Sequence, residues 1–71
     1  MKDQCAWLVA FGQRVVALRR ERGLSQLALE SASGLDATYL SGVEQGRRNL
    51  GLINVHKLAE ALGVPPGALF D

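Results

Sequence analysis

The sequence predicts an all-α domain of five helices, and three observations support this fold class. Apolar residues recur at spacings of three and four, the period of one face of a helix. Four of these stretches end at a glycine, where helices commonly place a left-handed residue. These glycines are Gly23, Gly34, Gly46 and Gly63. No segment shows the strict alternation of a half-buried strand. At 71 residues the chain has room for one domain, residues 1–71.

The predicted helices lie between these glycines. In chain order they span residues 4–22, 26–32, 37–45, 52–62 and 66–70, the last being a short turn. Ser25 and Asp36 are predicted to cap the second and third helices, because short polar side chains accept hydrogen bonds from free N–H groups at a helix start. Pro66 suits the first position of the last helix, where its missing N–H would be unpaired anyway.

The apolar faces of the first and fourth helices predict the core. The first helix carries Leu8, Phe11, Val15 and Leu18 on one stripe. Trp7, four residues before Phe11, is also expected in the core. The fourth helix presents Leu52, Val55, Leu58, Ala59 and Leu62 on one face.

Composition and single reactive residues exclude several classes of protein. The hydrophobic content of 48% is too high for a disordered chain, and the apolar runs are too short to span a membrane. Cys5 is the only cysteine and His56 the only histidine, so a multi-cysteine or two-histidine metal site cannot form. We therefore expect no enzyme and no cofactor. The N-terminus lacks the pattern of an export signal, and we expect a cytoplasmic protein.

Charge is distributed unevenly along the chain, although the net charge is only +1. Residues 14–22 carry a local charge of +3, and Arg47 and Arg48 form a second basic point. Residues 49–71 carry a net charge of −1. Such a molecule could bind nucleic acid with its basic side and a protein with the other.

Residues 25–45 have the form of a helix-turn-helix motif. Two short helices joined by a glycine-containing turn can place the second helix in the major groove of DNA. Leu29, Leu35, Leu40 and Val43 are expected in the shared core of the two helices, whereas Thr38, Ser41, Gly42 and Gln45 point outward. Small outward side chains permit a close approach to DNA.

The chain resembles the Cro and phage-repressor type of helix-turn-helix protein, also called the xenobiotic-response-element family, over residues 11–70. The segments that carry the resemblance are Leu18-Arg19, Arg22-Gly23-Leu24-Ser25-Gln26, Ser33-Gly34-Leu35, Thr38-Tyr39-Leu40-Ser41-Gly42-Val43-Glu44, Gly46-Arg47-Arg48-Asn49 and Lys57-Leu58-Ala59-Glu60-Ala61-Leu62-Gly63-Val64. The run from Tyr39 to Leu62 is most similar to the controller proteins of restriction-modification systems. The resemblance implies a repressor-like five-helix fold and a transcription regulator that binds double-stranded DNA.

The resemblance also implies roles for individual residues. The implied DNA-binding set is Ser25, Gln26, Ala37, Thr38, Tyr39, Ser41, Arg47, Arg48 and Asn49. Gln26 would hold a phosphate at a helix N-terminus, and Ala37 would at most touch a thymine methyl group. Arg48 is the first candidate to read a guanine. Tyr39 could instead belong to the core, and both readings remain open.

Further charged residues receive a structural or an open interpretation. The resemblance implies that Arg19 and Glu44 form a structural ion pair between the first and third helices. Arg14, Arg20 and Arg22 could form a solvated face or contact DNA.

Glu30 departs from the family pattern, since a small residue usually stands there and allows close helix packing. A carboxylate at this position must reach solvent, find a cation or be desolvated at a cost of several kcal/mol. We expect Glu30→Ala to raise stability by about 1 to 3 kcal/mol, as relief of a buried charge would.

The start of the fourth helix suggests self-association. Leu50, Ile53, Asn54 and His56 lie on or beside this helix, off its core face, and are expected to form a homodimer interface. A two-fold dimer would read a pseudo-palindromic operator. A monomer is the alternative. Two other functions remain open: an antitoxin-like protein whose main ligand is a partner protein, and an interaction domain without DNA binding.

Overall fold

The computed structural model describes residues 5–71, which fold into four α-helices and one 3-10 helix. The elements are α1 (Ala6–Glu21), α2 (Gln26–Ser33), α3 (Ala37–Glu44), α4 (Leu52–Leu62) and η1 (Pro66–Phe70). The all-α prediction is confirmed, with the correction that the fifth helix is a 3-10 helix. The ends predicted for α2 and α3 each differ from the observed ends by one residue. The start predicted at Gln4 lies outside the described residues.

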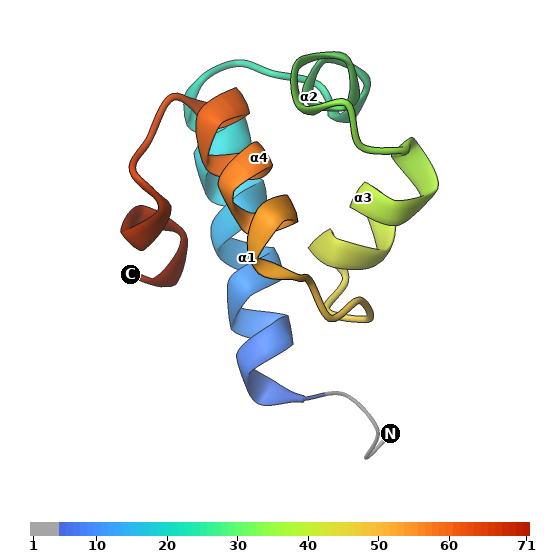
Figure 1. The fold of residues 1–71 in the computed structure, drawn as a ribbon, viewed down its shortest axis with the longest axis vertical. Helices are drawn as coiled ribbons and strands as arrows, with labels where there is room; N and C mark the ends of the chain where they lie inside the picture. Colours follow the sequence, from blue (N-terminus) through green and yellow to red (C-terminus); the bar gives the residue numbers. More distant parts are fainter. Residues whose placement is uncertain (1–4) are drawn as a thin grey trace.

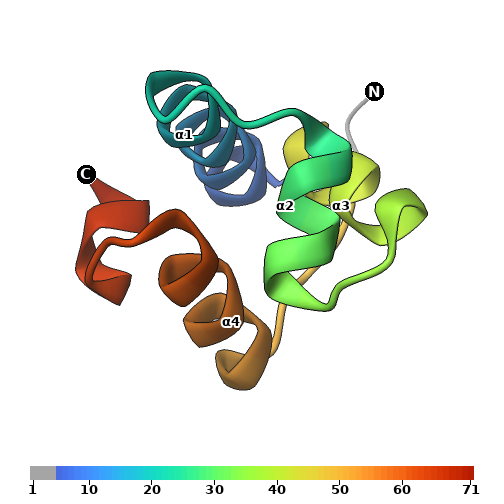
Figure 2. The same cartoon turned by 90° about the horizontal axis from the view of Figure 1, so that it is seen from above.

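The elements form a closed ring around one core. Helix α1 contacts α3 and η1, α4 contacts α2 and η1, and α2 contacts α3. Figure 2 shows this ring from above, with the core between α1, the α2–α3 pair and α4. In Figure 1, the first turn of α1 extends beyond the other helices at one end of the molecule. Each helix therefore buries only the stripe that faces the centre of the ring.

Among residues 5–71, twelve apolar side chains are buried in this core. They are Phe11, Val15, Leu18, Leu29, Leu35, Leu40, Val43, Val55, Leu58, Ala59, Leu62 and Leu69. Leu29, Leu35, Leu40 and Val43, which the sequence placed between the motif's two helices, all belong to it. The shared core fixes α3 against α2 and leaves the opposite face of α3 open.

The predicted helix-ending glycines and the predicted capping residues are confirmed. The four glycines predicted to end helices all have positive φ, between 67° and 77°. Gly34, at φ 75°, ends α2, and its N–H bonds back to the Glu30 carbonyl group. The Ser25 hydroxyl accepts from the Ala28 N–H at 3.0 Å, and Asp36 accepts from two N–H groups at the start of α3. These caps and turns set the short connections between the helices.

Three residues predicted in the core are not in it. Trp7 is 83% exposed and Leu52 is 74% exposed, while Leu8 is partly exposed. Helical spacing gives the direction of a side chain, but it does not say whether a neighbouring helix reaches that level. Trp7 and Leu8 lie on the first turn of α1 and Leu52 on the first turn of α4, where the packing leaves Trp7 and Leu52 exposed and covers Leu8 only in part.

Glu30 is not desolvated, in contrast to the expectation from the sequence. Its side chain is partly exposed and lines an open hollow beside the turn between α2 and α3. Among the described residues, no buried side-chain nitrogen or oxygen lacks a hydrogen-bond partner. Glu30 therefore reaches solvent and does not pay the cost of a buried, unpaired carboxylate.

Gly12 lies where α1 crosses α3. A Cβ atom at this position would lie 2.3 Å from the Val43 carbonyl oxygen and 2.8 Å from that of Glu44. Only a residue without a side chain permits this approach of two helix backbones. No local pattern in the sequence indicates the role of Gly12, because that role depends on residues more than thirty positions away.

Candidate nucleic-acid interface

The outward face of α3 forms a shallow hollow together with the loop that follows it. Its lining residues are Ala37, Thr38, Ser41, Gly42, Gln45, Arg47 and Arg48. Five of them belong to the predicted DNA-binding set. Gln45 was predicted to point outward but was left out of that set; its Nε2 donates to the Ser41 hydroxyl at 3.0 Å. The surface combines small polar groups with two exposed arginines, as groove binding requires.

Tyr39 packs against the core and also contacts Arg48 of this surface. Its side chain is partly buried against the core, while its ring lies beneath the Arg48 guanidinium, with 5.6 Å from Cζ to the ring centroid. The Tyr39 hydroxyl accepts a hydrogen bond from Asn54 Nδ2 at 3.1 Å. A place in the core and a place beside DNA, the two interpretations of Tyr39 that the sequence left open, therefore do not exclude each other.

Gln26 and Ser25, at the start of α2, are both engaged within the protein. Gln26 Nε2 donates to Glu44 Oε1 at 3.0 Å, and the Ser25 hydroxyl caps the helix. An amide nitrogen carries two hydrogens, so one N–H of Gln26 remains for a further acceptor. Asn49 is exposed in the loop after α3. Eight of the nine predicted residues therefore lie on α2, on α3 or in the loop after α3, and Ser25 caps α2 from the position before it.

Arg19 and Glu44 form a bidentate ion pair. Arg19 Nε donates to Glu44 Oε2 at 2.7 Å, and Nη2 donates to Oε1 at 3.1 Å. The two side chains are 14% and 8% exposed. Arg14, by contrast, donates to the Ala68 carbonyl group at 2.8 Å and lies near Asp71, so it ties α1 to η1.

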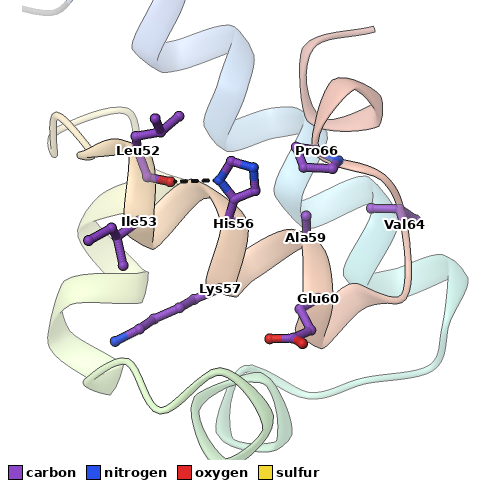
Figure 3. A pocket seen from close by; sticks show the side chains of 8 residues that line it. All are labelled: Leu52, Ile53, His56, Lys57, Ala59, Glu60, Val64 and Pro66. Atoms are coloured by element: carbon purple, nitrogen blue, oxygen red, sulfur yellow. Dashed lines mark hydrogen bonds between the residues drawn. The ribbon is translucent and has the colours of Figure 1, made fainter.

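The outer face of α4 carries the second candidate surface (Figure 3). Its lining residues are Leu52, Ile53, His56, Lys57, Ala59, Glu60, Val64 and Pro66. Ile53 is 72% exposed beside the exposed Leu52, and His56 Nδ1 lies 3.2 Å from the Leu52 carbonyl oxygen. Of the predicted dimer residues, Ile53 and His56 lie on this face. The other two are placed differently.

Leu50 and Asn54 face the protein rather than the outer surface of α4. Leu50 packs against the core from the loop before α4, and Asn54 is partly buried with its amide on Tyr39. Leu52 was not predicted as a surface residue, because it shares the helical spacing that defines the core stripe of α4. It missed the Asn54–Tyr39 bond because no periodic pattern links residues on different helices.

Metal-binding clusters and membrane-spanning helices are both absent from residues 5–71. No group of three or more His, Cys, Asp or Glu side chains in this part of the chain could hold a metal ion. No helix there has the length and apolar character to cross a bilayer.

Comparison with known proteins identifies related sequences and structures. A helix-turn-helix family model matches residues 15–69. The control protein C.BamHI of Bacillus amyloliquefaciens is 42% identical over 62 residues, covering 86% of this chain and 76% of that protein. The structure of the restriction-modification controller C.AhdI from Aeromonas hydrophila superimposes with a TM-score of 0.91 at 53% identity, covering 93% of this chain and all of that one.

A third relative has been solved with DNA. It is the restriction-modification controller C.Esp1396I, as a tetramer in complex with its natural 35 base-pair operator. It superimposes with a TM-score of 0.87 at 30% identity and covers 94% of this chain and 88% of that chain.

Proposed function

The chain belongs to the helix-turn-helix family of DNA-binding transcription regulators, and on this premise we propose that it binds a specific operator as a homodimer. Its role is that of a restriction-modification controller. The likeness to C.BamHI and C.AhdI supports this role, and the operator complex of C.Esp1396I supports the kind of ligand. Residues 1–71 act as one DNA-binding domain.

The main support for the proposal is the composition of the outward face of α3. Thr38, Ser41 and Gly42 leave this face with small side chains, and Arg47 and Arg48 stand exposed at its end. A helix with such a face can enter a major groove about 12 Å wide. The two guanidinium groups then lie beside the groove, where one can reach a base edge and the other a phosphate.

Each predicted residue has a defined task in this arrangement. Arg48 reads a base, because a guanidinium can grip guanine with two hydrogen bonds. Arg47 and Asn49 bind phosphate, as do the free amide N–H of Gln26 and the helix start at Ser25. Thr38, Tyr39 and Ser41 lie in or beside the groove, and Ala37 can meet a thymine methyl group.

The α4 face serves as the dimer interface. Leu52 and Ile53 expose adjoining apolar side chains, and burial of such surface stabilises association. His56 and Lys57 lie on the same face. A two-fold axis there would pair the α3 helices at a spacing of about 34 Å, one turn of DNA. Such a dimer recognises two half-sites of a pseudo-palindrome.

This function needs neither a cofactor nor a catalytic group, and it places the protein in the cytoplasm with the DNA. An antitoxin-like role, in which a partner protein is the main ligand, is the alternative that the experiment below separates from it.

The test is selection from a pool of random DNA duplexes at two salt concentrations, with the mass of the complex measured by sedimentation. Wild type is compared with an Arg47→Ala/Arg48→Ala double variant. We expect a palindromic site bound by a dimer, with affinity that falls steeply as salt rises. The double variant should lose the selected site while remaining folded and dimeric. Absence of any enriched sequence with wild type would refute the proposal and favour the partner-protein role.

A further inference from the structure

We propose that Gly42 and Asn54 are positioning residues that hold Arg48 ready to read its base, with the ring of Tyr39 as the intermediary. This inference rests on the proposed DNA binding and adds two specificity-determining residues to it. Neither residue needs to touch DNA for this role. Gly42 acts through the space that it leaves, and Asn54 acts through one hydrogen bond.

Arg48 lies across one face of α3 and does not extend freely from its loop. Its guanidinium lies 5.6 Å from the centre of the Tyr39 ring, within the range of about 6 Å at which a cation is attracted to an aromatic face. An arginine on a loop otherwise loses much rotamer freedom when it binds. A side chain that is already docked loses less, so the base contact gains affinity and precision.

Gly42 provides the space that this docking needs. Gly42 and Tyr39 are three residues apart on α3, so they are neighbours on one face of the helix. A Cβ atom on Gly42 would lie 2.8 Å from Arg48 Cγ and 3.3 Å from Arg48 Nε. Any larger residue must therefore displace the Arg48 side chain. The absent side chain of Gly42 removes a polar contact with DNA but gives Arg48 its position.

Asn54 fixes the orientation of the Tyr39 ring from a different helix. Its Nδ2 donates to the Tyr39 hydroxyl at 3.1 Å, and both side chains are partly buried. The hydroxyl is the end of the ring farthest from the α3 backbone, so this bond holds the ring at both ends. Because Asn54 belongs to α4, the helix with the proposed dimer face also sets the platform on which Arg48 rests.

The experiment measures base preference at a single operator position. Arg48→Ala first identifies the position at which preference depends on Arg48. Gly42→Ala, Asn54→Ala, Tyr39→Phe and the Asn54→Ala/Tyr39→Phe double variant are then compared with wild type at that position. Gly67→Ala is the matched control for Gly42→Ala, since a Cβ atom there meets no atom within 4 Å. Thermal unfolding and sedimentation monitor the fold and the dimer.

We expect Gly42→Ala, Asn54→Ala and Tyr39→Phe each to reduce the preference at the Arg48 position by about 3- to 10-fold, part of the roughly 5- to 150-fold that a bidentate contact can supply. The salt dependence, which reports phosphate contacts, should stay close to wild type. The double variant should lose no more than either single variant, because both remove the same hydrogen bond. Gly67→Ala should keep the wild-type preference.

Three results would overturn the inference. In the first, Arg48→Ala abolishes the base preference at that position, but folded Asn54→Ala and Tyr39→Phe variants keep it. This comparison tests the inference even if Gly42→Ala does not fold. Another is additive losses in the double variant, which would indicate that Tyr39 contacts DNA by itself. The third is an Arg48→Ala variant that changes no base preference. If wild type selects no sequence at all, the proposed function itself fails.

Discussion

The carboxylate of Glu44 is held by Arg19 through two hydrogen bonds, of 2.7 Å and 3.1 Å, that join α3 to α1. The same carboxylate accepts from Gln26 of α2, and Arg19 also donates to the Leu24 carbonyl group between α1 and α2. One ion pair therefore links the first three helices. It lies behind the candidate DNA-binding face and fixes the angle at which α3 is presented.

Removal of one partner from this pair should destabilise the protein strongly. Glu44→Ala or Arg19→Ala leaves a mostly buried charge without its partner, and we expect a loss of about 3 kcal/mol in the free energy of unfolding. The Arg19→Ala/Glu44→Ala double variant should lose less than the sum of the two, because neither charge is left alone. Urea denaturation measures all three. Strictly additive losses would show that the two side chains act independently.

Gly12→Ala should destabilise the crossing of α1 and α3. Alanine stabilises an open helix position by up to about 1 kcal/mol relative to glycine. At Gly12, however, the new methyl group would collide with the backbone of α3, and we expect a net loss of about 1 to 3 kcal/mol. Gly67→Ala, with open space around it, is the control and should change stability by less than about 0.5 kcal/mol. A more stable Gly12→Ala protein would mean that the two helices can separate at little cost.

Ile53→Lys should weaken the proposed dimer. A charge on the exposed apolar face of α4 would oppose its twin across a two-fold axis, so we expect the dimer dissociation constant to rise by at least about tenfold. Sedimentation equilibrium measures the constant. Leu27→Lys is the matched control, because Leu27 on α2 is 71% exposed, close to the 72% of Ile53. Equal effects of the two substitutions would argue against α4 as the interface.

Arg47→Ala should weaken DNA binding without changing its sequence preference. Loss of one phosphate contact reduces the slope of log affinity against log salt by about 0.9 for each protomer. Arg48→Ala provides the contrast, since it should relax preference at one base position. Titrations of a selected operator at four salt concentrations distinguish the two. A relaxed base preference in Arg47→Ala would assign base reading to that residue as well.

Glu30→Ala should have little effect on stability. The partly exposed carboxylate is not desolvated, so its removal relieves no buried charge, and we expect a change within about 0.5 kcal/mol. This replaces the gain that the sequence alone predicted for a buried carboxylate. Urea denaturation at neutral pH provides the measurement. A gain above about 1 kcal/mol would show that Glu30 strains the packing of α2 after all.

Local signals in the sequence were sufficient to predict the helices and the residues that cap them. Gly34 and Gly63 end helices because they adopt positive φ without a steric penalty, and Ser25 and Asp36 begin helices because their side chains accept from nearby N–H groups. These effects act over three or four residues, so the order of residues is enough to reveal them. The all-α fold and the motif at residues 25–45 follow from the same signals.

Tertiary structure alone decided which faces of those helices are covered. Trp7 and Leu52 satisfy helical spacing yet are 83% and 74% exposed, because the packing of the helices leaves these two side chains outside the core. The contact of Gly12 with the α3 backbone and the bond from Asn54 to Tyr39 join segments that are distant in sequence. Periodicity determines the direction of a side chain relative to its own helix axis. The residues that surround that side chain depend on the lengths of the other helices and on the angles at which those helices cross.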